Sequence, residues 1–177
     1  VPFIGILGLT DTAVRLPSAI LGTLSIIFIY FLILELFPKN KKREGFDVSN
    51  FGEESALVGA FLFAISPWSL QFSRSAYEGN IGLFFLLGGL VFFLFSLKKS
   101  KYLLLSSVFF VLSMYSYHSF RLVVPLLLTL IEALFYKQLF KIKKAVVFSV
   151  VIFAFLVIPI FYSLVLSSSG TGSRLSM

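Results

Sequence analysis

Long apolar segments separated by short clusters of charge run through this sequence of 177 residues. A transmembrane helix needs about 20 apolar residues to cross roughly 30 Å of hydrocarbon. Charged residues make up 13% of the chain, against about 25% in a soluble domain. The apolar segments lie at residues 14–37, 56–72, 81–97, 102–117, 122–136 and 145–166. The sequence therefore predicts an all-α, polytopic transmembrane bundle of about six spans, with residues 1–177 belonging to one transmembrane domain.

The basic residues are unevenly distributed between the predicted loops. The loops at 38–55, 98–101 and 137–144 hold 11 of the 15 Lys and Arg residues, including every lysine. By the positive-inside rule these loops are cytoplasmic, so 38–55 is predicted to be a cytoplasmic loop. We expect a multi-pass protein of the plasma membrane. The net charge of +7 is thus explained by topology, and no nucleic-acid partner is expected. The absence of cysteine excludes disulfides and thiolate metal sites.

The predicted outer side carries four arginines and no lysine: Arg15, Arg74, Arg121 and Arg174. Arginine presents a planar fork of donors that matches phosphate oxygens bidentately. An alternative is that each arginine only anchors its loop at the membrane interface. For the set as a whole, we favour a phosphate-binding role.

Residues 73–80 form the most polar outer loop. If they were helical, Arg74 and Glu78 would lie on one face and could pair. One interpretation is that these two charges simply neutralise each other at the headgroup level. The other is that Arg74 contacts a phosphate while Tyr77 or Glu78 contacts a sugar hydroxyl.

His118, the only histidine, lies beside Arg121 on a second outer turn. It can be a structural group, a polar substrate contact or, with Glu78 as a partner, a metal ligand, although metal binding needs further ligands. No metal-binding residue is assigned from the sequence, and the binding of a divalent metal by the full-length protein is left open. Two acids lie within the spans, Glu35 and Glu132. Intramembrane carboxylates are often functional, but ion pairs with Lys39 and Lys137, respectively, are the favoured explanation.

The segment GLTDTAVRLPSAILG at residues 8–22 resembles a signature, G-x-x-[DE]-x-x-x-R-L-P-S-A-x-x-G, of GT-C glycosyltransferases. There it begins the second transmembrane helix. The most similar families are the dolichyl-phosphate-mannose–protein mannosyltransferases and the bacterial aminoarabinose transferases. The segments AISPW at 64–68 with Arg74, Tyr115–Pro125 and Gly170–Arg174 resemble later outer motifs of these families.

The resemblance implies a membrane enzyme that transfers a hexosyl or pentosyl group from a polyprenyl-phosphate donor to a glycan, lipid or protein acceptor on the extracytoplasmic side. The lipid phosphate leaves, and a carboxylate in the first outer loop acts as general base. In these families that carboxylate precedes the Arg-Leu-Pro-Ser motif, so Asp11 is not expected to be catalytic. No catalytic residue is assigned within the chain, which we expect to be a fragment that is inactive alone. The expected substrate contacts are Arg74, Tyr77, Glu78, His118, Arg121 and Arg174.

Two other classes of protein remain open. A transporter or flippase for a lipid-linked or anionic solute predicts broken helices and polar groups near the midplane of the membrane. The spans are almost free of such groups, which favours the enzyme. A non-catalytic membrane scaffold subunit is the third hypothesis. An acidic pair in the outer loop before Val1 would support the enzyme over both.

Overall fold

The computed structural model describes residues 8, 10–37, 51–75 and 77–172, and all of its secondary-structure elements are helices. The elements are α2 (Asp11–Leu36), α3 (Phe51–Ile65), α4 (Pro67–Arg74), α5 (Glu78–Ser96), α6 (Tyr102–Ser116), α7 (Phe120–Leu139), the short 3₁₀ helix η1 (Phe140–Ile142) and α8 (Lys143–Gly172). The predicted all-α class is confirmed for these residues.

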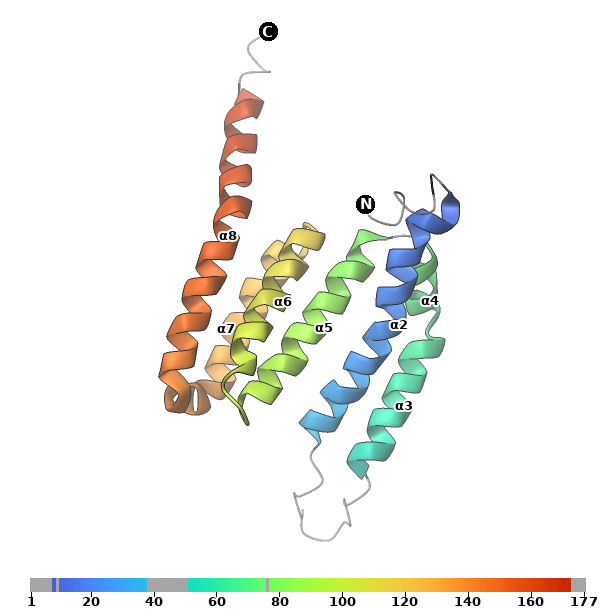
Figure 1. Ribbon diagram of the computed structural model, residues 1–177, viewed down its shortest axis with the longest axis horizontal. Helices are drawn as coiled ribbons and strands as arrows, with labels where there is room; N and C mark the ends of the chain where they lie inside the picture. Colours follow the sequence, from blue (N-terminus) through green and yellow to red (C-terminus); the bar gives the residue numbers. More distant parts are fainter. Residues whose placement is uncertain (1–7, 9, 38–50, 76, 173–177) are drawn as a thin grey trace.

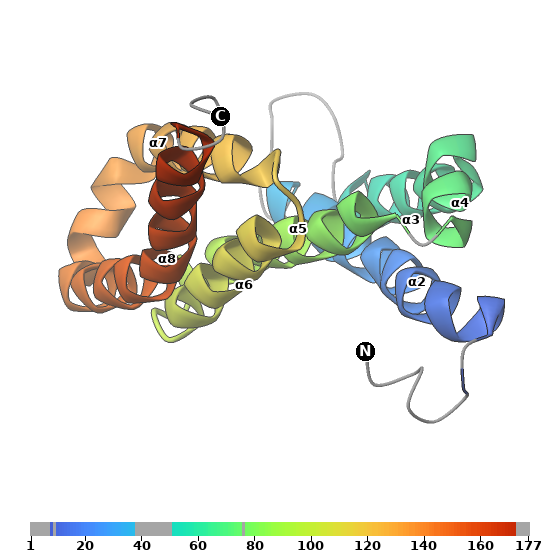
Figure 2. The ribbon, with the colours of Figure 1, turned by 90° about the horizontal axis from the view of Figure 1, so that it is seen from above.

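The helices run roughly alongside one another, with α3, α2, α5 and α6 side by side in that order (Figure 1). Helices α7 and α8 both pack on α6, at the end of this row away from α3 and α4 (Figure 2). The turns at 97–101 and 140–142, which carry lysines, lie at one end of the bundle (Figure 1). The beginnings of α2 and α7 and the end of α4, which carry Arg15, Arg121 and Arg74, lie at the other end.

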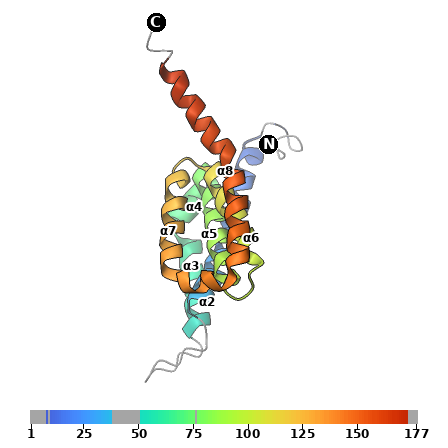
Figure 3. The same cartoon turned by 90° about the vertical axis from the view of Figure 1, so that its left-hand side faces the viewer.

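Among the described residues, three helical stretches are long and apolar enough to cross a membrane: Asp11–Leu36, Glu78–Ser96 and Phe120–Ile160. A fourth is counted if α3 and α4, which are bent by 54° at their junction, form one broken span. The third stretch covers α7, η1 and most of α8, and Figure 3 shows the chain reversing between α7 and α8. Helix α6 has 15 residues, which is about 22 Å of helix and short of the hydrocarbon thickness. Long apolar helices are thus present, but the predicted number of six spans is not confirmed.

Two boundaries differ from the sequence prediction. Helix α3 begins at Phe51 rather than after 55, because Glu53 and Glu54 fall in its first turn, where negative charge is favourable. Residues 38–50 of the predicted loop lie outside the described part of the chain. The polar segment 73–80 is also not one loop, because Arg74 ends α4 and Glu78 begins α5. The apolar segment 56–72 is broken near its middle, since α3 ends at Ile65 and Pro67 occupies the first position of α4.

Small residues allow close packing between α5 and α6. Ser106 and Ser113 on α6 donate hydrogen bonds to the carbonyls of Gly89 and Gly82 on α5, at 2.8 and 2.9 Å. A β-carbon at Gly89 would lie 2.8 Å from the ring of Phe110, a fully buried side chain of the core. Small residues at helix interfaces are the usual device for packing in membranes, where the hydrophobic effect does not drive association.

The ion pairs predicted for the two intramembrane acids turn out differently. Lys98, in the turn after α5, contacts both carboxylate oxygens of Glu35 at 2.7 Å, so the partner comes from another helix hairpin. The predicted partner Lys39 lies outside the described residues. Glu132 forms no ion pair with Lys137, whose ammonium lies 5.8 Å from the ring centre of Tyr136.

Candidate functional site

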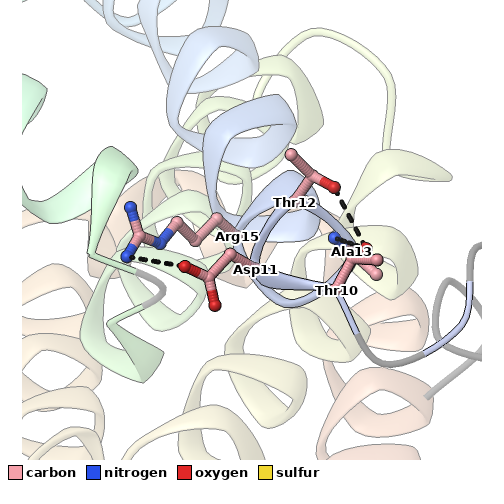
Figure 4. Close-up of polar contacts among 5 residues, drawn as sticks. All are labelled: Thr10, Asp11, Thr12, Ala13 and Arg15. Atoms are coloured by element: carbon pink, nitrogen blue, oxygen red, sulfur yellow. Dashed lines mark hydrogen bonds and ion pairs between the residues drawn. The ribbon is translucent and has the colours of Figure 1, made fainter.

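The first turns of α2 hold the motif on which the resemblance depends. The hydroxyl of Thr10 accepts a hydrogen bond from the amide of Ala13 and caps the helix (Figure 4). Arg15 and Asp11 form an ion pair at 3.8 Å, with side chains 61% and 93% exposed (Figure 4). Such an exposed pair contributes about 0–1 kcal/mol. The guanidinium of Arg15 is therefore bound only weakly by Asp11 and can bind another anion.

Arg15 and Arg74 line the same open hollow, of about 430 Å³. The rest of its wall comes from α4 and the residue after it: Pro67, Leu70, Gln71 and Ser75. Two guanidinium groups at one polar hollow make an arrangement suited to phosphate, because each can donate two parallel hydrogen bonds.

Helix α4 is held against α2 by buried polar contacts. The hydroxyl of Ser18 donates to the carbonyl of Phe72 at 3.2 Å, and Asn80 donates to the carbonyl and hydroxyl of Ser18. Ser18 and Asn80 are 1% and 4% exposed. Gly22 permits the approach, because a β-carbon there would lie 2.7 Å from that of Ser73. These contacts fix the position of Arg74 relative to Arg15.

An aromatic pocket of about 330 Å³ lies on the other face of α4. Its aromatic lining comes from the α3–α4 break, the α4–α5 junction and the α6–α7 turn: Phe63, Trp68, Phe72, Tyr77, Tyr117 and Phe120. The hydroxyls of Tyr77 and Tyr117 hydrogen-bond at 2.9 Å, and Tyr77 stacks on Phe72 with ring centres 5.0 Å apart. The pocket therefore has apolar walls and a pair of phenolic hydroxyls.

The hydrogen bond between the two tyrosines shifts their pKa values in opposite directions. It raises the pKa of Tyr77 and lowers that of Tyr117, and a second hydrogen bond from Ser119 lowers the pKa of Tyr117 further. This pattern fits a bond in which the hydroxyl of Tyr77 donates to the oxygen of Tyr117. The pocket mouth thus offers one phenol that ionises more readily than usual.

The structure brings only some of the predicted substrate contacts together. Tyr77 lines the aromatic pocket and Arg74 the hollow, on opposite faces of α4. Glu78 and His118 are exposed and line neither space. The predicted Arg74–Glu78 pair is not formed, because the two residues lie on different helices. Arg174 lies outside the described residues.

Arg121 lies in the first turn of α7, and its Nε is buried with no hydrogen-bond partner in the part of the chain that the structure describes. It lines neither the hollow nor the aromatic pocket. No group of three or more His, Cys, Asp or Glu side chains is close enough to hold a metal ion in the described ranges. The pairing of His118 with Glu78 therefore gains no further ligand there.

Sequence reasoning missed two residues of this region. Arg15 was counted among the outer arginines but not among the expected substrate contacts, although its place in the Arg-Leu-Pro-Ser motif was the available signal. Tyr117 was passed over because nothing in the sequence relates it to Tyr77, 40 residues earlier.

Comparisons with known proteins add nothing to this geometry. No family model, no curated protein and no solved structure matches the chain.

Proposed function

We propose that this chain belongs to a membrane glycosyltransferase that moves a sugar from a polyprenyl-phosphate donor to an acceptor on the extracytoplasmic side of the plasma membrane. The observation that carries the proposal is the hollow shared by Arg15 and Arg74 at the start of the helix with the Arg-Leu-Pro-Ser motif. The resemblance of residues 8–22 to GT-C enzymes supports the same reaction.

The chemistry suits two arginines at this place. In sugar transfer the acceptor oxygen attacks the anomeric carbon, and the bond from that carbon to the lipid phosphate oxygen breaks. Negative charge then accumulates on the departing phosphate, and positioned cationic donors stabilise it more in the transition state than in the ground state. Arg15 and Arg74 are the residues that we propose for this role. The general base comes from a carboxylate outside the described residues.

Helix α4 also suits a ligand with a charged head and an apolar body. One face, with Pro67, Leu70 and Arg74, borders the hollow, and the other, with Ser69 and Phe72, borders the aromatic pocket. Trp68 is 73% exposed, as is common for tryptophan at a membrane interface. An amphiphile held by its phosphate at the arginines therefore has an apolar surface close by.

The test measures transfer of a labelled sugar from polyprenyl phosphate by the full-length protein in membranes. Arg74→Ala is expected to lower the rate about tenfold or more, since a hydrogen bond to a charged group contributes about 1.5–3 kcal/mol. Arg74→Lys is expected to recover only part of the loss, because an ammonium lacks the bidentate fork. Lys99→Ala, an exposed cation at the other end of the bundle, serves as the control. Unchanged transfer and donor affinity in Arg74→Ala would exclude the proposed phosphate site.

The alternative is a transporter or flippase of a lipid-linked or anionic solute. Such a protein predicts broken helices and polar groups near the midplane of the membrane, whereas the hollow of Arg15 and Arg74 is formed by the first turns of α2 and by α4. Uptake of polyprenyl-phosphate sugar into vesicles without transfer would favour this function.

A further inference from the structure

A second cavity, of about 210 Å³, lies between α5, α6, α7 and α8 and plays no part in the proposed sugar transfer. Nine of its 13 lining residues are apolar, among them Phe93, Phe110 and Phe153. An engineered apolar cavity of about 150 Å³ binds benzene. The space here is therefore large enough for an apolar ligand with about ten non-hydrogen atoms.

The other four lining residues are polar and come from three helices: Ser106 and Ser107 on α6, Glu132 on α7 and Ser149 on α8. Glu132 precedes Lys137 by five positions, or about 7 Å along a helix. An acid at such depth in a membrane-spanning segment is expensive to keep and commonly marks a functional site. This group was not predicted from the sequence, because its members are far apart in the chain.

The hydrogen bonds already made in the cavity define what a ligand must supply. The hydroxyls of Ser106 and Ser107 donate to the carbonyls of Gly89 and Leu103, so their oxygens remain able only to accept. Ser149 is 5% exposed, and its hydroxyl has no hydrogen-bond partner among the described residues. The carboxylate of Glu132, an acceptor when ionised, forms no ion pair with another described residue. The polar lining is thus rich in acceptors and carries negative charge.

We propose that this cavity binds a hydrophobic primary amine, with its ammonium among Glu132, Ser149 and the two α6 serines and its apolar body against the phenylalanines. A primary ammonium has three donors and no acceptor, which matches the lining. A carboxylate or phosphate would meet acceptors and a like charge. A bare sodium ion would leave most of the apolar wall uncovered. The amine can be a free molecule or the aminoethyl head of a membrane lipid.

Radiolabelled 2-phenylethylamine is the probe, with the full chain in phosphatidylcholine nanodiscs. We expect saturable binding. We also expect 2-phenylethanol, 3-phenylpropanoate and the N-trimethylated amine to compete about tenfold more weakly or worse, because each lacks the charge or the donors. Glu132→Gln is expected to weaken binding about tenfold or more, whereas Glu54→Gln, an exposed acid on α3, leaves it within about twofold.

A second pair of variants tests the cavity without touching the carboxylate. Leu128→Phe fills the space and is expected to abolish binding, while Leu126→Phe, on a 70% exposed side chain of the same helix, preserves it. Replacing half of the lipid by phosphatidylethanolamine separates the two sources, since a lipid ammonium that reaches the site competes with the probe. The proposal is overturned if the unmodified chain shows no saturable binding, if phenylethanol binds as well as the amine, or if Glu132→Gln and Leu128→Phe both bind normally.

Discussion

The side-chain amide of Asn80 on α5 donates hydrogen bonds to the carbonyl and the hydroxyl of Ser18 on α2, at 2.9 and 3.1 Å. Ser18 in turn donates to the carbonyl of Phe72 on α4. One buried serine of the Arg-Leu-Pro-Ser motif therefore joins three helices. The motif has a structural role beside the proposed phosphate role of Arg15, because these bonds set where α4 presents Arg74.

Asn80→Leu tests this junction. The substitution removes both donors and leaves the Ser18 hydroxyl partly unsatisfied, so we expect a loss of about 1–3 kcal/mol in the free energy of unfolding. The loss is measured by unfolding in mixed detergent micelles with increasing denaturing detergent. Thr23→Ala is the control, since Thr23 is exposed and bonds within its own helix, and its change should stay within about 0.5 kcal/mol. Equal effects in the two variants would contradict the structural role.

Gly22→Ala tests the close approach of α2 and α4. The added methyl group would lie 2.7 Å from the β-carbon of Ser73 and 2.9 Å from Nδ2 of Asn80, neither of which can move without shifting its helix or its hydrogen bonds. We expect destabilisation of about 1–3 kcal/mol by overpacking, together with weaker donor binding at Arg74. Gly59→Ala is the matched control, because its methyl group would meet only the flexible end of Ile33. A tolerated Gly22→Ala with full donor affinity would show that the spacing is not critical.

The helical segments were predictable because hydropathy and proline act locally. Long apolar runs produced α2, α5, α7 and α8, and Pro67 separates α3 from α4 because proline lacks the amide donor that continues a helix. Helix α4 was not predicted as a separate element, because most of it was placed within the predicted span 56–72 and its last residues in the loop 73–80. Six apolar segments did not give six confirmed spans, because α6 is short and the chain bends before α4.

The site was harder to predict because it depends on residues that are distant in sequence. Nothing local shows that Asn80 reaches Ser18 or that Tyr77 reaches Tyr117. Lys98 was not recognised as the partner of Glu35, since pairing was sought along the same segment. The acceptor groups of the second cavity were overlooked for the same reason, since three helices contribute them.

The two tyrosines of the aromatic pocket are expected to titrate separately. Their hydrogen bond lowers the pKa of Tyr117 and raises that of Tyr77, so Tyr117 ionises first. In Tyr77→Phe the pKa of Tyr117 is expected to rise towards its ordinary value of about 10. In Tyr117→Phe the pKa of Tyr77 is expected to fall towards the same value. Tyrosine ring carbon shifts in NMR measure both, with Tyr162→Phe on α8 as the control.

The directions of these two pKa shifts also predict how the free energy of unfolding depends on pH. The lowered pKa of Tyr117 contributes stability that is present above its unfolded pKa and lost as pH falls through the folded pKa. The raised pKa of Tyr77 contributes stability that is present below its unfolded pKa and lost as pH rises through the folded pKa. The pair is therefore expected to help the fold most between the two folded pKa values. A stabilisation that kept growing above both would contradict the hydrogen-bonded pair.

The pair formed by Glu35 and Lys98 joins α2 to the turn after α5, and its members differ in exposure. The Glu35 side chain is 15% exposed and the Lys98 side chain 64%. Lys98→Leu leaves a mostly buried carboxylate without its partner, so we expect a loss of about 1–3 kcal/mol in the free energy of unfolding. Lys99→Ala, on an exposed neighbour in the same turn, should change it by no more than about 0.5 kcal/mol. The double variant Glu35→Leu with Lys98→Leu should recover most of the loss, because it removes the buried charge along with its partner. If the double variant were as unstable as the sum of Glu35→Leu and Lys98→Leu, the two side chains would be energetically independent, and the contact would not hold the hairpins together.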